Sequence, residues 1–227
     1  MRRSLTIDPR RAALILIDLQ EEQRQVPEYS VEGLDKILGH AGKLLEAARA
    51  NGVMVVHTAY RRDFQKAPPR PLEFVALDGR PAFSDKDSPL IAICREVAPH
   101  RGEPVLFKND ASAFCEGELE PLLRDAAVEW LVVAGVWTEA CVAATVRDAI
   151  ARGIRVLLVK DACGSGTRAM HETGILNLAN RLSGGAVATT ETATRLIAGG
   201  AAEVWAAERP VPMLFGYGDA EELYRAL

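Results

Sequence analysis

Short apolar runs alternate with segments of helical spacing along most of this chain, and this alternation restricts its fold more than any other feature. The apolar runs are continuous rather than alternating with polar residues, which is typical of strands covered on both faces of a sheet. Such runs occupy residues 12–19, 53–57, 104–107, 130–134, 154–159 and 186–189. Segments with helical spacing cover residues 31–50, 118–126, 139–152 and 167–182, and a last one ends near residue 198. The pattern predicts a three-layer α/β/α sandwich around a six-stranded, mostly parallel sheet.

The length of 227 residues suits one large α/β domain. We expect this domain to span residues 1–198. Residues 199–227 fall outside the strand-helix rhythm, and we expect them to form an arm that packs on the same or a neighbouring subunit. A long polar stretch at residues 61–87 predicts a loop of the kind that is often functional.

Charge and cysteine content exclude several classes of protein. The chain has 27 Lys and Arg against 31 Asp and Glu, a formal net charge of −4, and both signs are scattered. This argues against a nucleic-acid surface, which needs clustered basic residues. Because no apolar run approaches the ~20 residues that span a bilayer and no leader is evident, we expect a soluble, cytoplasmic protein without a membrane partner. The four cysteines are widely spaced and form no CxxC pair.

Three reactive side chains follow three different predicted strands. Asp18 ends the first, Lys108 ends the third, and Cys141 comes shortly after the fourth. Because ligands of open parallel sheets collect at the carboxyl ends of the strands, these residues are candidates for one site. Each alone has a simpler interpretation, as a turn residue, a solvated lysine or a core cysteine. Together they supply an acid, a positive charge and a thiol near a helix start that favours its thiolate.

Ordered motifs around these residues resemble the isochorismatase-like hydrolase superfamily, in its cysteine hydrolase branch. The resemblance covers roughly residues 11–198 and implies a Rossmann-like strand order. The motifs are IDLQ at 17–20, FKNDASAF at 107–114, VAGVWTEACV at 133–142 and KDACGSG at 160–166, followed by His171.

The resemblance implies a catalytic triad of Asp18, Lys108 and Cys141 and a thioester intermediate on Cys141. Asp18 would move the protons, and Lys108 would hold the negative charges in register. Backbone N–H groups of Trp137 and Cys141 would bind the oxyanion, beside a cis peptide at Val136–Trp137. Thr138 and Glu139 are more simply explained as capping and first-turn residues. The resemblance also implies a homo-oligomer, a dimer or tetramer.

Several residues are candidates for the wall of a substrate pocket, namely Gln20, Gln23, Arg61, Val136 and Trp137. Gln23 stands where the family often has Phe, so this wall is either polar or displaced. The nicotinamidase branch binds a metal through paired histidines after its second strand. Here that segment is HTAYRRD, with His57 inside the strand, so we expect no metal and no cofactor.

The function predicted from these motifs is hydrolysis of the C–N bond of a small amide, ureido or carbamoyl compound. One alternative is isochorismatase-type vinyl-ether hydrolysis, which uses the acid and does not need the thiol. Another is a non-catalytic or redox-sensing protein of the same fold, with Cys141 and Cys163 as reactive thiols. The substrate and the oligomer size do not follow from the sequence.

Overall fold

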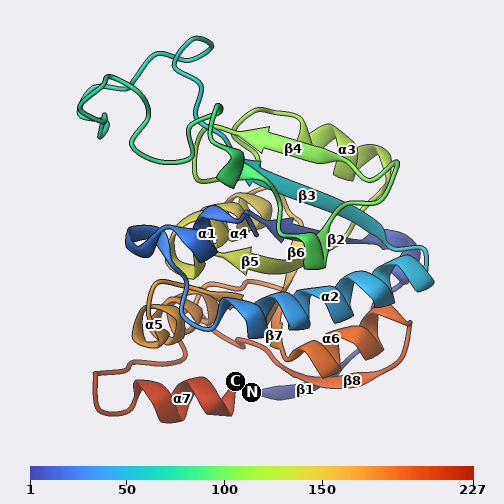
Figure 1. Cartoon of the computed structure of the whole chain (residues 1–227). Coiled ribbons are helices and arrows are strands. Elements are labelled where there is room, and N and C mark those ends of the chain that lie inside the picture. Colours follow the sequence, from blue (N-terminus) through green and yellow to red (C-terminus); the bar gives the residue numbers. More distant parts are fainter.

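The computed structural model describes residues 1–227 and has one sheet between two layers of helices (Figure 1). Strand order is β1-β8-β7-β6-β5-β2-β3-β4, and all neighbours from β7 to β4 are parallel. The strands are β1 (Arg2–Leu5), β2 (Ala12–Ile17), β3 (Met54–Tyr60), β4 (Val105–Lys108), β5 (Trp130–Val136), β6 (Arg155–Gly164), β7 (Ala186–Ala188) and β8 (Ala202–Trp205). The α-helices are α1 (Glu22–Gln25), α2 (Leu34–Ala50), α3 (Leu119–Asp125), α4 (Ala143–Ala151), α5 (Arg168–Ala179), α6 (Thr190–Ile197) and α7 (Ala220–Ala226).

The expected mostly parallel α/β sheet is confirmed, but the expected number of six strands was wrong, because the sheet has eight. The six predicted strands form the parallel part. The two additional strands, β1 and β8, pair antiparallel with each other, and β8 joins the sheet at β7 through Val187 and Trp205. Each is only four residues long, and β1 is largely exposed, so neither has the apolar run by which the other strands were recognised. Their pairing joins the two ends of the chain.

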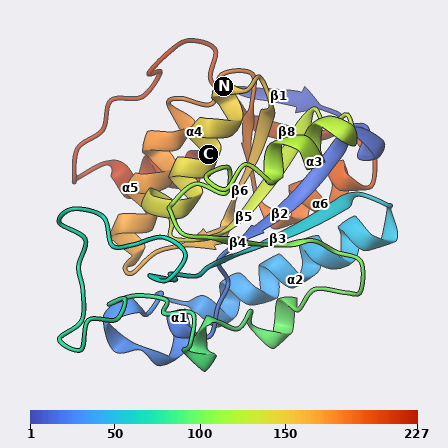
Figure 2. The ribbon, with the colours of Figure 1, turned by 90° about the horizontal axis from the view of Figure 1, so that it is seen from above.

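Two apolar cores lie on the two faces of the sheet. One core joins the sheet to α2 and α6, and the other joins it to α3, α4 and α5. Figure 2 shows α2 on one side of the sheet and α4 and α5 on the other. α2 packs against the sheet with a stripe of buried residues, Leu34, Ile37, Leu38, Ala41, Leu44, Leu45 and Ala48, as expected for an amphipathic helix.

The C-terminal segment makes contacts with the rest of the chain. The side-chain amide of Asn180 bonds to the backbone of Met213 through both its donor and its acceptor, at 2.9 and 3.0 Å. The amine of Lys160 donates to the carbonyl of Tyr224 at 2.7 Å in α7.

None of the helices combines the length and the apolar character that crossing a bilayer requires.

The strand ends that matter for the site are neighbours in the sheet, because β5, β2, β3 and β4 follow one another in that order. Gly135 lets β5 approach β2 unusually closely. It has φ +131°, and a Cβ there would overlap the backbone of Ile17. The turn after β5 therefore lies directly beside the residue that follows β2.

Candidate active site

Asp18, Lys108 and Cys141 meet at the carboxyl edge of the sheet. The Lys108 amine lies 2.7 Å from Asp18 Oδ2 and donates to Cys141 Sγ at 3.3 Å and to the Asp110 carbonyl at 2.9 Å. The hydroxyl of Thr58 on β3 donates to Asp18 Oδ1 at 2.8 Å. An acid that follows β2, a cation at the end of β4 and a thiol in the turn after β5 thus form one contiguous group.

Burial controls the electrostatics of this group. Asp18 and Lys108 are 2 % and 1 % exposed. Burial by itself lowers the pKa of Lys108, but the neighbouring Asp18 and Cys141 raise it above its ordinary value, so this amine stays charged. Asp18 Oδ2 has no hydrogen bond of good geometry despite its proximity to Lys108. This oxygen therefore keeps capacity to accept a proton.

The surroundings of Cys141 raise the pKa of its thiol, contrary to the thiolate expected from its place near a helix start. Burial, followed by the charge of Asp18, raises its pKa to about 12, and Lys108 only partly opposes this. The loss of solvation outweighs the effect of the single cation on this pKa. A base must remove the thiol proton before the sulfur can attack a carbonyl.

A single π-helical turn, Thr138–Val142, holds Cys141 between β5 and α4. Such turns are rare and occur frequently at functional sites. The peptide bond Val136–Trp137 is cis. The backbone N–H of Trp137 donates to no other backbone group, so it is free to bind a ligand at the start of the turn.

Thr138 was expected to cap this turn, and that expectation was wrong. The residue at the cap position is Trp137, which makes no side-chain cap bond. Thr138 instead donates its hydroxyl to the Gly164 carbonyl at 3.0 Å and lies 2.8 Å from His171 Nδ1. Its hydroxyl thereby ties the turn to β6 and α5.

A cavity of about 350 Å³ opens beside the thiol. Three of the five candidate pocket residues line it, namely Gln23, Val136 and Trp137. Four further lining residues were not predicted from the sequence, namely Glu28, Tyr29, Phe83 and Ala140. The rings of Tyr29 and Phe83 meet edge to face, with centroids 4.8 Å apart. The only local signal for Tyr29 and Phe83 is that each is a single aromatic residue among mostly polar neighbours.

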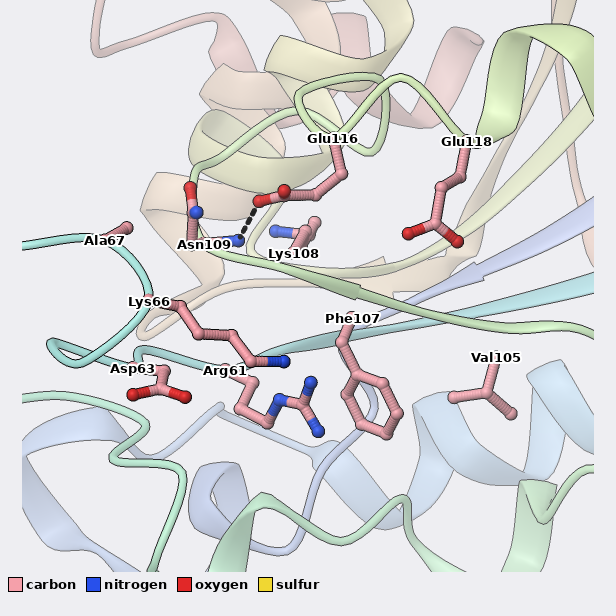
Figure 3. A pocket seen from close by; sticks show the side chains of 10 residues that line it. All are labelled: Arg61, Asp63, Lys66, Ala67, Val105, Phe107, Lys108, Asn109, Glu116 and Glu118. Carbon is pink, nitrogen blue, oxygen red and sulfur yellow. Dashed lines mark hydrogen bonds between the residues drawn. The ribbon is translucent and has the colours of Figure 1, made fainter.

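Gln20 and Arg61, the other two candidates, lie outside this cavity. The Gln20 amide is fully buried and bonds to the backbone of Tyr60 and Ile91, so it braces the loops around the site. Arg61 stacks on the ring of Phe107 at 3.8 Å. Figure 3 shows Arg61 and Lys66 in a second pocket of about 280 Å³, which shares no lining residue with the first.

His171 and His57 have polar neighbours, and Cys163 is buried. Burial lowers the pKa of His171 to about 4, and its ring lies between the hydroxyls of Thr138 and Tyr224. His57 Nε2 lies 3.0 Å from Glu103, which also pairs with Arg49. Cys163 is 2 % exposed, and burial raises the pKa of its thiol to about 12.

One group could offer three metal ligands, Glu21, Cys94 and Glu96. The guanidinium of Arg24 lies 3.1 Å from Glu21 and 2.9 Å from Glu96. These carboxylates are therefore already neutralised by a side-chain cation, and their thiol neighbour has a pKa raised to about 12 by burial. The donor set fits a local ion-pair network better than a metal centre.

Comparison with known proteins assigns the fold and the motifs to one family. The model of the isochorismatase domain matches residues 12–192. Maleamate amidohydrolase of Pseudomonas putida is 34 % identical over 174 residues, which cover 74 % of this chain and 79 % of that protein. N-carbamoylsarcosine amidase of Arthrobacter is 30 % identical over 194 residues, which cover 82 % and 71 %.

A solved structure, the cysteine hydrolase from Pseudomonas syringae pv. phaseolicola, has the same fold. It superimposes with a TM-score of 0.76 at 23 % identity, covering 85 % of this chain and 95 % of that one.

Proposed function

Because this chain belongs to the isochorismatase family, we propose that it is a cysteine-dependent hydrolase of small amide, ureido or carbamoyl compounds. The observation that carries the proposal is the Lys108 amine in contact with both Asp18 and Cys141, beside a cavity that can hold a small molecule. The relatives named as amidohydrolases support cleavage of a C–N bond.

In the proposed mechanism, Asp18 takes the proton of the Cys141 thiol as Sγ attacks the carbonyl carbon of the substrate. The C=O π electrons move to oxygen, and the resulting oxyanion is bound by the N–H groups of Trp137 and Cys141. Asp18 then gives its proton to the leaving nitrogen as the C–N bond breaks, which leaves a thioester. Water, deprotonated by Asp18, attacks the thioester and regenerates the thiol.

Lys108 has an electrostatic role in this scheme. Its charge stabilises the carboxylate of Asp18 while that group waits to accept a proton, and it stabilises the sulfur as negative charge develops there. The redox alternative has less support, because Cys163 is buried and Sγ of Cys163 faces the Val133 carbonyl at 3.8 Å rather than another thiol.

An ammonia-release screen tests the proposal. Amides, ureido acids, biuret-like compounds and nicotinamide would be offered to the wild-type protein, with Cys141→Ala as the blank. Cys141-dependent release of ammonia supports the proposal, and release by neither protein across the whole panel contradicts it.

Gln23 has an unsatisfied amide that the substrate could satisfy. Its side chain is 2 % exposed, lines the cavity and makes no hydrogen bond within the chain; Oε1 is completely buried, so the Nε2 donor is the atom that a substrate could meet. We expect Gln23→Met to raise the melting temperature, since an unpaired buried amide is costly. We also expect kcat/KM to fall about tenfold, because the substrate loses one hydrogen-bonding partner. Thermal unfolding and ammonia release measure both effects, and unchanged kcat/KM would show that Gln23 does not bind substrate.

We also propose that the protein is an oligomer of identical chains. Large apolar side chains are exposed on the loop that projects from the sheet between β3 and β4 and on the C-terminal segment (Figure 1). They are Leu72, Phe74, Leu77, Leu214 and Tyr217, each at least 86 % exposed. Burial of such residues between copies would be favourable. Sedimentation at micromolar concentration should give a dimer or larger species, whereas an active monomer would contradict this proposal.

A further inference from the structure

The cavity beside Cys141 carries acidic groups without a free cation. Asp18 and Glu28 line it, and no arginine or lysine does. The nearest cation, Lys108, is already in contact with Asp18, with Cys141 and with the Asp110 carbonyl. A substrate carboxylate placed here would meet negative charge and find no counter-ion.

The basic residues near the cavity in sequence are engaged elsewhere. Arg24 follows Gln23, but its guanidinium pairs with Glu21 and Glu96. Arg61 and Lys66 line the second pocket, where Arg61 stacks on Phe107 (Figure 3). None of these three cations lines the cavity beside the thiol.

A further carboxylate lies close behind the cavity wall. Glu22 is 6 % exposed and accepts bonds from the backbone N–H and the hydroxyl of Ser84, the residue after Phe83. The pKa of Tyr29 is raised by burial and then by the charges of Glu22 and Glu28. The surroundings of Tyr29 therefore carry an excess of negative charge.

The rest of the wall is apolar and largely aromatic. Tyr29, Phe83 and Trp137 contribute rings, and Val136 and Ala140 contribute aliphatic surface. Rings of this kind suit a flat apolar body, and they also stabilise cations that lie against their faces.

We propose that the substrate is an amide with a flat apolar body whose acyl part is cationic or neutral, and that the cavity selects against a carboxylate. This inference rests on the proposed function, since it concerns the same cavity. The charge of Glu28 at the exposed rim and the lack of a free cation produce the selection, and Gln23 supplies the polar contact.

Three amides of nearly equal shape test this selectivity. They are 4-(aminomethyl)benzamide, 4-methylbenzamide and 4-carbamoylbenzoate, which are cationic, neutral and anionic at neutral pH. We expect kcat/KM for the cationic and neutral amides to exceed that for the anion about tenfold or more at low ionic strength. Added salt should reduce the difference in kcat/KM between the cationic and the anionic amide.

Glu28→Gln is the variant that isolates the charge, because Glu28 is exposed and makes no ion pair that the fold needs. We expect it to lower the cation-to-anion ratio of kcat/KM about threefold to tenfold. Glu46→Gln is the matched control, since Glu46 is exposed on α2 and forms no salt bridge. This control should leave the ratio unchanged.

Calorimetric binding of the same three amides to Cys141→Ala separates selectivity from chemistry. If the cation and the neutral amide bind more tightly than the anion but wild-type protein hydrolyses none of them, the charge selectivity stands and the proposed hydrolysis of these amides fails. If the anion is the best substrate or ligand, if none of the three binds, or if Glu28→Gln leaves the ratio unchanged, the inference is overturned.

Discussion

Cys141→Ala is expected to lose amide hydrolysis on the order of 10⁴-fold or more, while the protein stays folded. The thiol is the only cysteine in the cavity, and without it the acyl group has no sulfur to which it can be transferred. The other members of the site cannot replace it, because Asp18 and Lys108 are held against each other at 2.7 Å. Removal of one half-buried sulfur should change the free energy of unfolding by only about 1 kcal/mol.

The experiment measures activity by ammonia release and folding by circular dichroism. It also uses mass spectrometry of the wild-type protein mixed with substrate. The mass measurement should find an acyl group on the peptide that contains Cys141. Cys115→Ala is the matched control, because Cys115 is exposed and lies outside the cavity, and it should retain full activity. Near-wild-type turnover by Cys141→Ala would exclude the thioester and favour acid catalysis by Asp18, as in vinyl-ether hydrolysis.

Lys108→Met is expected to remove most turnover and also to destabilise the fold. Lys108 and Asp18 are an almost fully buried ion pair. Loss of the cation leaves the Asp18 charge uncompensated, which costs about 3–5 kcal/mol of unfolding free energy. The pKa of Cys141, already raised by burial and Asp18, should rise further because Lys108 is the group that opposes this shift.

Urea unfolding measures the loss of stability, and ammonia release measures the loss of turnover. The pH dependence of Cys141 alkylation, followed by peptide mass, measures the change in the pKa of the thiol. The double variant Asp18→Asn/Lys108→Met should recover much of the lost stability, since no unpaired charge is left inside, yet remain inactive. Lys43→Met removes an exposed lysine of α2 and controls for the change in net charge. Wild-type turnover and an unchanged alkylation profile in Lys108→Met would remove this lysine from the mechanism.

The parallel part of the sheet could be predicted because a strand covered on both faces must be apolar at every position. β2 is buried at all six residues and β5 at all seven, so their sequences alone identify them. The same logic placed Asp18, Lys108 and Cys141 at one edge, since parallel strands end on the same side. β1 and β8 were not predicted because each is only four residues long and the two strands pair with each other from opposite ends of the chain.

The properties that decide the chemistry depend on distances between segments remote in sequence. The position of Cys141 near a helix start predicted a thiolate, but its burial against Asp18 raises the pKa of the thiol instead. Tyr29 and Phe83 form a cavity wall only because two loops meet there. The side chain of Gln20 bonds to the backbone of Tyr60 and Ile91 and therefore does not line the pocket. The sequence by itself determined which strands are buried and which reactive side chains follow them, because burial and chain order are local properties. Only the tertiary structure decided the charge and shape of the cavity, because solvation and electrostatic interaction depend on every group that folding brings within a few ångströms.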